Sequence, residues 1–243
     1  MPFSIEKSRR YAVYFAPPEN SALWRAGCGW LGRDAVTGET LGQQVGNGIA
    51  PSRLADITEA PRFYGFHATL KPPFHLHEDM TEAELIAAME AFAAGRAAFE
   101  AGPLMVARLG RFLALVLEAA SPEMESLAAD CVRAFDAFRA PSSRNDLKRR
   151  RQQGLTQRQD SYLRTWGYPY VMEEFRFHMS LTGGFDDEAL RSQAEAILND
   201  RFEPFATQPL AVESVCLFQQ DDRRTPFRLK ARFPFGRQVG VDA

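Results

Sequence analysis

A five-residue pattern occurs twice in this chain, at residues 66–70 and 177–181. Both copies read apolar, His, apolar, hydroxyl, apolar: FHATL in the first and FHMSL in the second. Because alternate side chains of a β-strand point to opposite faces, the His and the hydroxyl of each copy share one face. We therefore expect two strands that bury one side and present an imidazole beside a hydroxyl on the other.

The predicted elements around the two copies also follow a common order. A helix with a capping-box start at Thr81 follows the first copy, and a helix starting at Asp186-Asp187 follows the second. Two strand-like runs come after each helix, at residues 104–109 and 112–118 and at residues 210–218 and 227–233. This recurrence of motif and element order predicts two related lobes that face a common cleft.

Three further segments complete the predicted order. A first strand is expected at residues 11–16, a mainly irregular connection at residues 27–48, and a helix from Ser121 to about Arg139. Residues 141–169 carry a basic run at residues 148–151, and this segment is read as a linker, an exposed helix or a lid.

Composition limits the classes of protein to consider. The 243 residues, 45% of them hydrophobic and 25% charged, are sufficient for a globular core. The net charge of −2 argues against a general nucleic-acid binder. Three widely spaced cysteines suggest neither a disulfide framework nor a zinc cluster, and the sequence shows neither a signal peptide nor a membrane-spanning run. We therefore expect a cytoplasmic protein that is not embedded in a membrane.

The two motifs supply the groups that phosphate chemistry needs. His67 and His178 are candidates for an acid and a base, since imidazole titrates near neutral pH. Thr69 and Ser180 are candidates for hydroxyl donors that hold a phosphate. This scheme requires no metal and no other cofactor. The alternative is that both histidines only satisfy hydrogen bonds in a core.

Four other residues are candidates for contact with a substrate. Strand alternation places Lys71 and Arg176 on the histidine-bearing side, where they either neutralise phosphate charge or lie exposed at strand ends. Tyr11 and Tyr64 either line the cleft or pack in the core.

A metal site is the weaker interpretation of a second histidine pair. His75 and His77 would share a strand face, but no Cys or carboxylate spacing accompanies them.

At these residues the chain resembles the 2H phosphoesterase superfamily, whose members carry two copies of apolar-His-apolar-Thr/Ser-apolar. Residues 10–17, 64–74, 166–170 and 175–182 are similar to one branch, which is encoded among phosphonate-utilisation genes. The resemblance implies an α+β fold: a single bilobal domain over residues 1–243, with antiparallel sheets lining a central cleft and helices outside.

The resemblance also implies the roles of the motif residues. His67 and His178 take the acid and base positions, and Thr69 and Ser180 take the phosphate-binding positions. Ser180 is a Thr in many relatives, a departure that keeps the donor. The sequence does not assign which histidine is the acid, nor the oligomeric state.

The activity that follows is hydrolysis of a small cyclic phosphodiester without a metal. A ribose cyclic phosphate from phosphonate catabolism is the expected substrate, so the expected partner is a small phosphorylated metabolite. Two alternatives are a phosphodiesterase acting on RNA ends and a non-catalytic protein that binds a phosphate metabolite.

Overall fold

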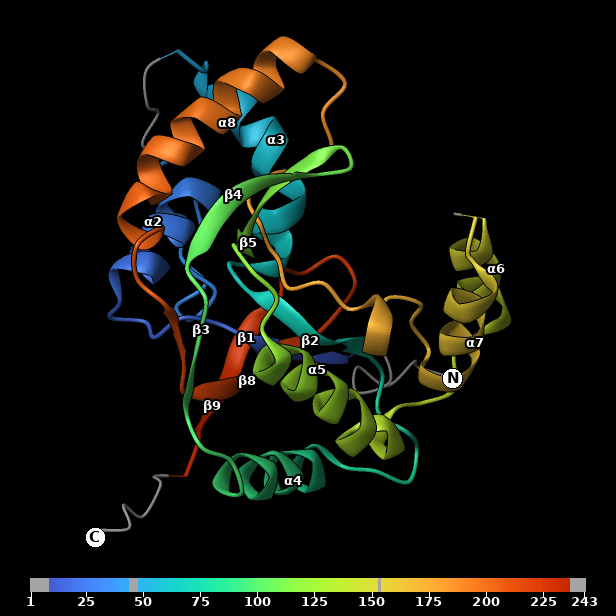
Figure 1. The fold of residues 1–243 in the computed structure, drawn as a ribbon. Helices are drawn as coiled ribbons and strands as arrows, with labels where there is room; N and C mark the ends of the chain where they lie inside the picture. The colour runs from blue at the N-terminus through green and yellow to red at the C-terminus, as the bar shows by residue number, and fades with distance from the viewer. Residues whose placement is uncertain (1–8, 44–47, 153, 237–243) are drawn as a thin grey trace, which may run out of the picture.

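The computed structural model describes residues 9–43, 48–152 and 154–236, and it contains one long antiparallel sheet (Figure 1). Seven strands pair in the order β4-β5-β6-β2-β1-β8-β9. Their bounds are β1 Arg10–Phe15, β2 Ala68–Phe74, β4 Leu104–Leu109, β5 Phe112–Leu117, β6 Met179–Ser180, β8 Ser214–Gln220 and β9 Arg228–Pro234. A separate two-stranded sheet joins β3 (Phe99–Ala101) to β7 (Leu210–Val212).

Helices lie around this sheet in three groups (Figure 1). The first group is α2, α3 and α8, the second is α4 and α5, and the third is a hairpin of α6 and α7 that stands to one side. Their bounds are α2 Ala22–Leu31, α3 Pro51–Tyr64, α4 Glu82–Ala94, α5 Pro122–Ala134, α6 Arg144–Arg151, α7 Gln157–Trp166 and α8 Glu188–Phe202.

Helix starts follow local capping chemistry. The Thr81 hydroxyl accepts the Glu84 amide at 3.2 Å, and the Glu84 carboxylate accepts the Thr81 amide at 2.8 Å, which completes the predicted capping box of α4. Ser121 caps α5 and Asp187 caps α8 in the same way, each accepting an amide of the first turn. These three predicted helix starts are confirmed.

Some predicted boundaries differ from the structure. Residues 27–48 were expected to be mainly irregular, but α2 continues to Leu31 and ends at Gly32, whose φ of 77° favours glycine. The segment expected to be a single strand at residues 210–218 breaks at Glu213, so β7 and β8 belong to different sheets. The helix expected to reach about Arg139 ends at Ala134 and is followed by a 3₁₀ turn.

The expected α+β class with antiparallel sheets is confirmed, since every strand pairing among the described residues is antiparallel. The strands that begin within the two histidine motifs, β2 and β6, are direct neighbours within a single continuous sheet. His67 and His178 were expected within strands, but each lies one residue before its strand. The two halves of the chain therefore meet through hydrogen-bonded strands.

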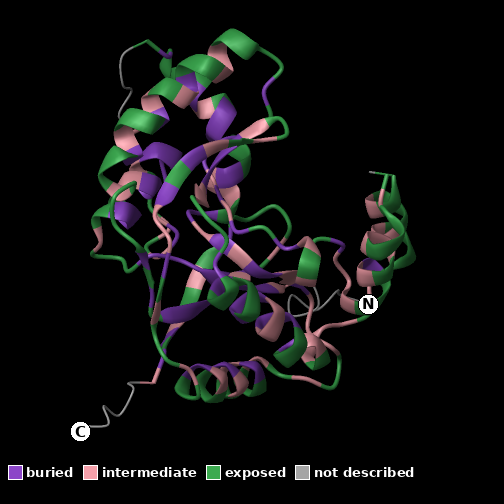
Figure 2. Ribbon diagram, in the orientation of Figure 1, coloured by how far each residue is buried: buried purple, intermediate pink, exposed green. Residues whose placement is uncertain are grey.

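The core lies between the sheet and the helices that cover it (Figure 2). Phe66, just before β2, is fully buried and stacks on Phe202 of α8, with Gly27 of α2 close enough that only a glycine fits. At the other end of β2, α5 packs against the strand. Within the described ranges, no helix has the length and apolar character needed to span a bilayer.

Candidate functional site

Strand register brings the four motif side chains together. β2 pairs with β6 through Ala68 opposite Met179. In an antiparallel pair this register sets His67 opposite Ser180 and Thr69 opposite His178. All four side chains are partly exposed, whereas both pairing residues are buried. We call the group formed by His67, Thr69, His178 and Ser180 the histidine face.

The strand of the second motif, β6, is only two residues long, so hydrogen bonds from neighbouring segments hold it in place. The Leu181 amide donates to the Leu113 carbonyl at 2.9 Å, and the Leu113 amide donates to the Thr182 hydroxyl at 2.9 Å. The Trp30 indole donates to the Leu181 carbonyl at 2.7 Å. These buried bonds fix the chain just after Ser180 and with it the second half of the histidine face.

Backbone carbonyls determine the proton positions of both imidazoles. His67 Nδ1 lies 2.9 Å from the Gly65 carbonyl, and His178 Nδ1 lies 2.8 Å from the Arg176 carbonyl. A carbonyl can only accept, so Nδ1 carries the hydrogen in each neutral ring. The Nε2 atoms then hold the free lone pairs, and Nε2 of His67 lies 3.1 Å from the Thr69 hydroxyl, which can donate to it.

The surroundings of His67 keep it neutral. Burial lowers the pKa of His67 to about 4, against the opposing effect of the Gly65 carbonyl, and the nearby His178 lowers it further. The Tyr14 ring stacks on the imidazole with ring centroids 3.7 Å apart, and the Phe218 ring lies 6.0 Å away. At pH 7 His67 is therefore a proton acceptor at Nε2.

Tyr14 and Phe218 were not among the candidates from the sequence. Both lie on the side of the sheet that carries His67, because Tyr14 pairs with Thr69 of the histidine face and Phe218 pairs with Ala12, two residues before Tyr14. Tyr14 lies three residues after Tyr11 in the same strand, so the two rings point to opposite faces. Strand alternation was the signal that could have identified Tyr14.

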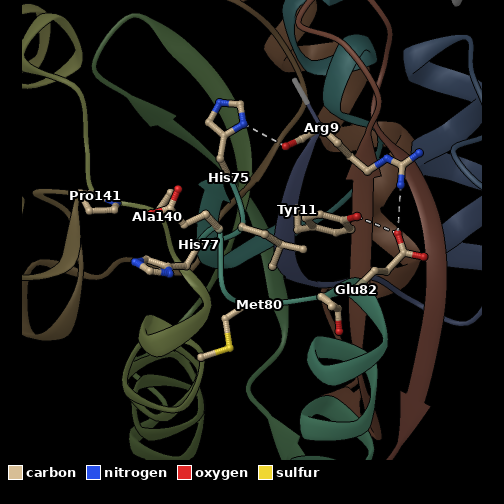
Figure 3. Close-up of a pocket in the computed structure, with 11 residues that line it drawn as sticks. Arg9, Tyr11, His75, His77, Met80, Glu82, Ala140 and Pro141 are labelled. Atoms are coloured by element: carbon tan, nitrogen blue, oxygen red, sulfur yellow. Dashed lines mark hydrogen bonds and ion pairs between the residues drawn. The ribbon is translucent and has the colours of Figure 1, made fainter. Parts of the chain in front are cut away.

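The two candidate tyrosines lie in different places. Tyr64 is 36% exposed, its ring is 6.4 Å from the His67 ring, and it stacks on Phe227 at 5.4 Å. Tyr11 is buried on the opposite face, where its hydroxyl donates to the Glu82 carboxylate at 2.7 Å (Figure 3). Burial raises the pKa of Tyr11 to about 12. Only Tyr64 borders the histidine face.

The Lys71 side chain lies on the side of the sheet opposite the histidine face, contrary to the expectation from strand alternation. Tyr14 pairs with Thr69 and Val13 pairs with Lys71, so β2 contains one extra residue at this point. Such a bulge reverses the direction of the following side chains. Lys71 is 1% exposed, and its Nζ lies 3.2 Å from the Asp136 carboxylate. It is thus a buried ion-pair partner inside the fold.

Arg176 does not follow strand alternation either. Residues 175–178 are outside any strand, and the exposed Arg176 guanidinium donates to the backbone carbonyls of Glu173 at 3.0 Å and Phe175 at 2.6 Å. The side chain therefore folds back on its own segment.

The second histidine pair lies outside the histidine face. His75 Nδ1 lies 2.9 Å from the Arg9 carbonyl (Figure 3). His77 Nδ1 lies 3.4 Å from the Asp79 carboxylate. In the part of the chain that the structure describes, no group of three or more His, Cys, Asp or Glu residues is placed to hold a metal ion.

Comparison with known proteins identifies the family. The model of a family described as "Protein of unknown function (DUF1045)" matches residues 69–228, well over half of the chain. The chain belongs to this family. The matched region contains Thr69 and the whole second histidine motif, and His67 lies two residues before it.

Two curated relatives are similar to this chain in sequence. A "Ribose 1,5-bisphosphate phosphokinase PhnN" from Janthinobacterium sp. (strain Marseille) is 37% identical over 97% of this chain and 52% of its own length. A protein of the same name from Laribacter hongkongensis (strain HLHK9) is 36% identical over 90% of this chain and 50% of its own length. The chain spans about half the length of these curated relatives.

One solved structure is also similar. A conserved protein of unknown function from Agrobacterium tumefaciens strain C58 is 16% identical, with a TM-score of 0.40, over 93% of this chain and 88% of its own.

These names correct the expected activity. The relatives are named as kinases, which contradicts the predicted hydrolysis of a cyclic phosphodiester and the assignment of a hydrolase. The motif supplied proton-transfer groups and phosphate donors, and these groups do not by themselves specify which reaction takes place. The PhnN name supports the expected link to phosphonate-utilisation genes.

Proposed function

We propose that this chain binds a phosphorylated ribose at the histidine face and that its two imidazoles exchange protons with the bound ligand. The observation that carries the proposal is the pairing of Ala68 with Met179, which sets two imidazoles and two hydroxyls beside one another. The relatives are named for ribose 1,5-bisphosphate, which supplies the class of ligand.

The arrangement suits a phosphate with an adjacent sugar. The hydroxyls of Thr69 and Ser180 donate to phosphate oxygens, and a neutral His67 accepts a proton from a sugar hydroxyl or a phosphate oxygen. Tyr64, which is partly exposed beside His67, offers a ring against which a sugar can pack.

The same motifs support a proposal about the fold. We propose that it is a two-lobed fold of the 2H phosphoesterase superfamily, with α4, β4 and β5 in one half corresponding to α8, β8 and β9 in the other. The equal order of these elements supports this correspondence.

Calorimetric titration tests the binding proposal. Ribose 1,5-bisphosphate, ribose 5-phosphate and ribose are titrated into the wild type, His67→Ala, Thr69→Val and the matched control His77→Ala, whose histidine lies outside the histidine face. We expect binding of the phosphorylated sugars, loss in the first two variants and no change in the control. Absence of binding by every phosphorylated ribose contradicts the proposal.

A separate arm asks about phosphoryl transfer. The relatives are named as kinases, but the sequence contains no G-x-x-x-x-G-K-[S/T] phosphate loop. ATP with Mg²⁺ is therefore added in a separate experiment, independent of the binding titrations. Phosphorus NMR then distinguishes binding alone from the formation of ADP and a newly phosphorylated sugar.

A further inference from the structure

A cavity of about 250 Å³ lies beyond the histidine face, between α6, the second half of β2 and the loop after β8. We call it the arginine cavity. Its lining includes Arg10, Arg149, Arg150 and Arg223, with Asp146 as the only carboxylate among the described lining residues. A concave site with this excess of guanidinium groups attracts anions.

These guanidinium groups are incompletely neutralised. Asp146 lies 2.9 Å from Arg149 and 3.8 Å from Arg223, so one carboxylate serves two cations. The Arg10 Nε donates to the neutral Gln220 amide at 2.7 Å. Burial lowers the pKa of Arg10, and repulsion from Arg223 lowers it further. A bound anion would relieve this crowding of like charges.

Arg150 of α6 lines the cavity, and an aromatic ring supports its guanidinium. Its guanidinium lies over the Tyr168 ring, 4.6 Å from the ring centroid. Within the described ranges it is not paired with a carboxylate. A guanidinium held over a ring keeps its hydrogen-bonding edge available for a phosphate.

Arg10 connects the arginine cavity with the histidine face. Arg10 and Tyr14 lie on the same side of β1, about 13 Å apart along the strand. The Arg10 guanidinium lies 5.3 Å from the centroid of the Phe227 ring, and Phe227 stacks on Tyr64, the ring that borders His67. The two sites are therefore adjoining parts of one surface.

We propose that the arginine cavity is a subsite for a second phosphate group, so that the chain selects a ribose with two phosphates over a ribose with one. This rests on the proposed binding of a phosphorylated ribose at the histidine face. One phosphate lies against Thr69 and Ser180, and the other is bound by Arg10, Arg150 and Arg223, where planar guanidinium groups match phosphate oxygens.

The test compares ligands in matched variants. Ribose 1,5-bisphosphate and ribose 5-phosphate are titrated into the wild type, Arg150→Gln and Arg223→Gln. The control, Lys148→Gln, removes the same charge from the same helix at a position outside the arginine cavity. We expect both arginine variants to bind the bisphosphate about 10- to 100-fold more weakly than the wild type, with little change in their affinity for the monophosphate. The control should bind both ligands as the wild type does.

Inorganic pyrophosphate makes the subsite testable on its own. We expect it to shift the arginine Nε–H signals of Arg10, Arg150 and Arg223 in nitrogen-15 NMR, also in His67→Ala. If no ribose ligand binds but pyrophosphate shifts these signals, the histidine-face proposal fails and the anion subsite stands. The subsite proposal is overturned if pyrophosphate leaves these signals unshifted. It is also overturned if the arginine variants bind the bisphosphate and the monophosphate with equally weakened affinity. Tighter binding of a 5′-phosphorylated RNA tetramer than of the bisphosphate would also overturn it, in favour of an RNA ligand.

Discussion

Acidification should destabilise this protein through His67. Burial lowers the pKa of this imidazole from 6.5 to about 4 in the folded chain. The unfolded chain therefore takes up the proton first as the pH falls, and stability decreases between pH 6.5 and pH 4. Since one pKa unit corresponds to about 1.4 kcal/mol, the loss accumulated by pH 4 is about 3 kcal/mol.

Urea unfolding at pH 7.5 and at pH 4.0 measures this loss. Other groups titrate over the same range, so the informative quantity is the difference between the wild type and His67→Gln, which cannot take up this proton. We expect the free energy of unfolding of the wild type to fall by about 3 kcal/mol more than that of the variant. His77→Gln is the matched control and should retain the wild-type loss.

NMR of the imidazole Cε1–H signals tests the cause directly. The signal absent from His67→Gln belongs to His67 and should titrate near pH 4. Replacing Tyr14 by Leu removes the ring stacked on His67, opens the imidazole to water and should move its pKa back toward 6.5. If the His67 signal titrates near 6.5 in the wild type, or if the wild-type and His67→Gln stability curves run parallel, the assignment of a desolvated imidazole is refuted.

Two further predictions concern the interior. Asp136→Ala leaves the buried Lys71 ammonium without its carboxylate and should lower the free energy of urea unfolding by about 3 kcal/mol. Lys71→Met should lower it much less, and equal losses in the two variants would contradict this prediction. Gly27→Ala places a methyl group 2.3 Å from the Phe66 ring and should lower stability by about 1–3 kcal/mol in thermal unfolding. In Gly29→Ala the new methyl makes only an ordinary 3.7 Å contact, so this helical control should be neutral or stabilising.

Features specified by neighbouring residues could be predicted from the sequence. The capping box of Thr81 and Glu84 begins α4, and the Gly110-Arg111 pair turns β4 into β5. Each needs only a few adjacent residues, so its signal is local. The juxtaposition of the two histidine motifs was also expected, because the same order of elements around both copies predicted two related lobes that face a common cleft.

Features set by distant partners could not be predicted in this way. The bulge in β2 appears only in the pairing of Val13 with Lys71, and it moves the lysine to the side covered by α5. The break at Glu213 depends on β3 capturing β7. The residues of the arginine cavity come from α6, β1 and the loop after β8, segments that no sequence spacing connects.

The class of reaction could not be predicted from the motif, for a chemical reason. An imidazole beside a hydroxyl serves any reaction that moves a proton near a phosphate, so the pattern indicated the kind of groups present but not the bond they act on. The names of the relatives, and not the geometry, contradicted the expected hydrolase.

The direct pairing of β2 with β6 has a consequence for the choice of ligand. Neighbouring strands lie about 4.8 Å apart, so the spacing between the two motifs is a property of the backbone ladder and not of an angle between lobes. A hinge cannot widen this span without breaking sheet hydrogen bonds. The spacing within the histidine face is therefore set by the sheet, whereas the proposed position of the second phosphate is set by the arginine cavity, which α6, β1 and the loop after β8 line together.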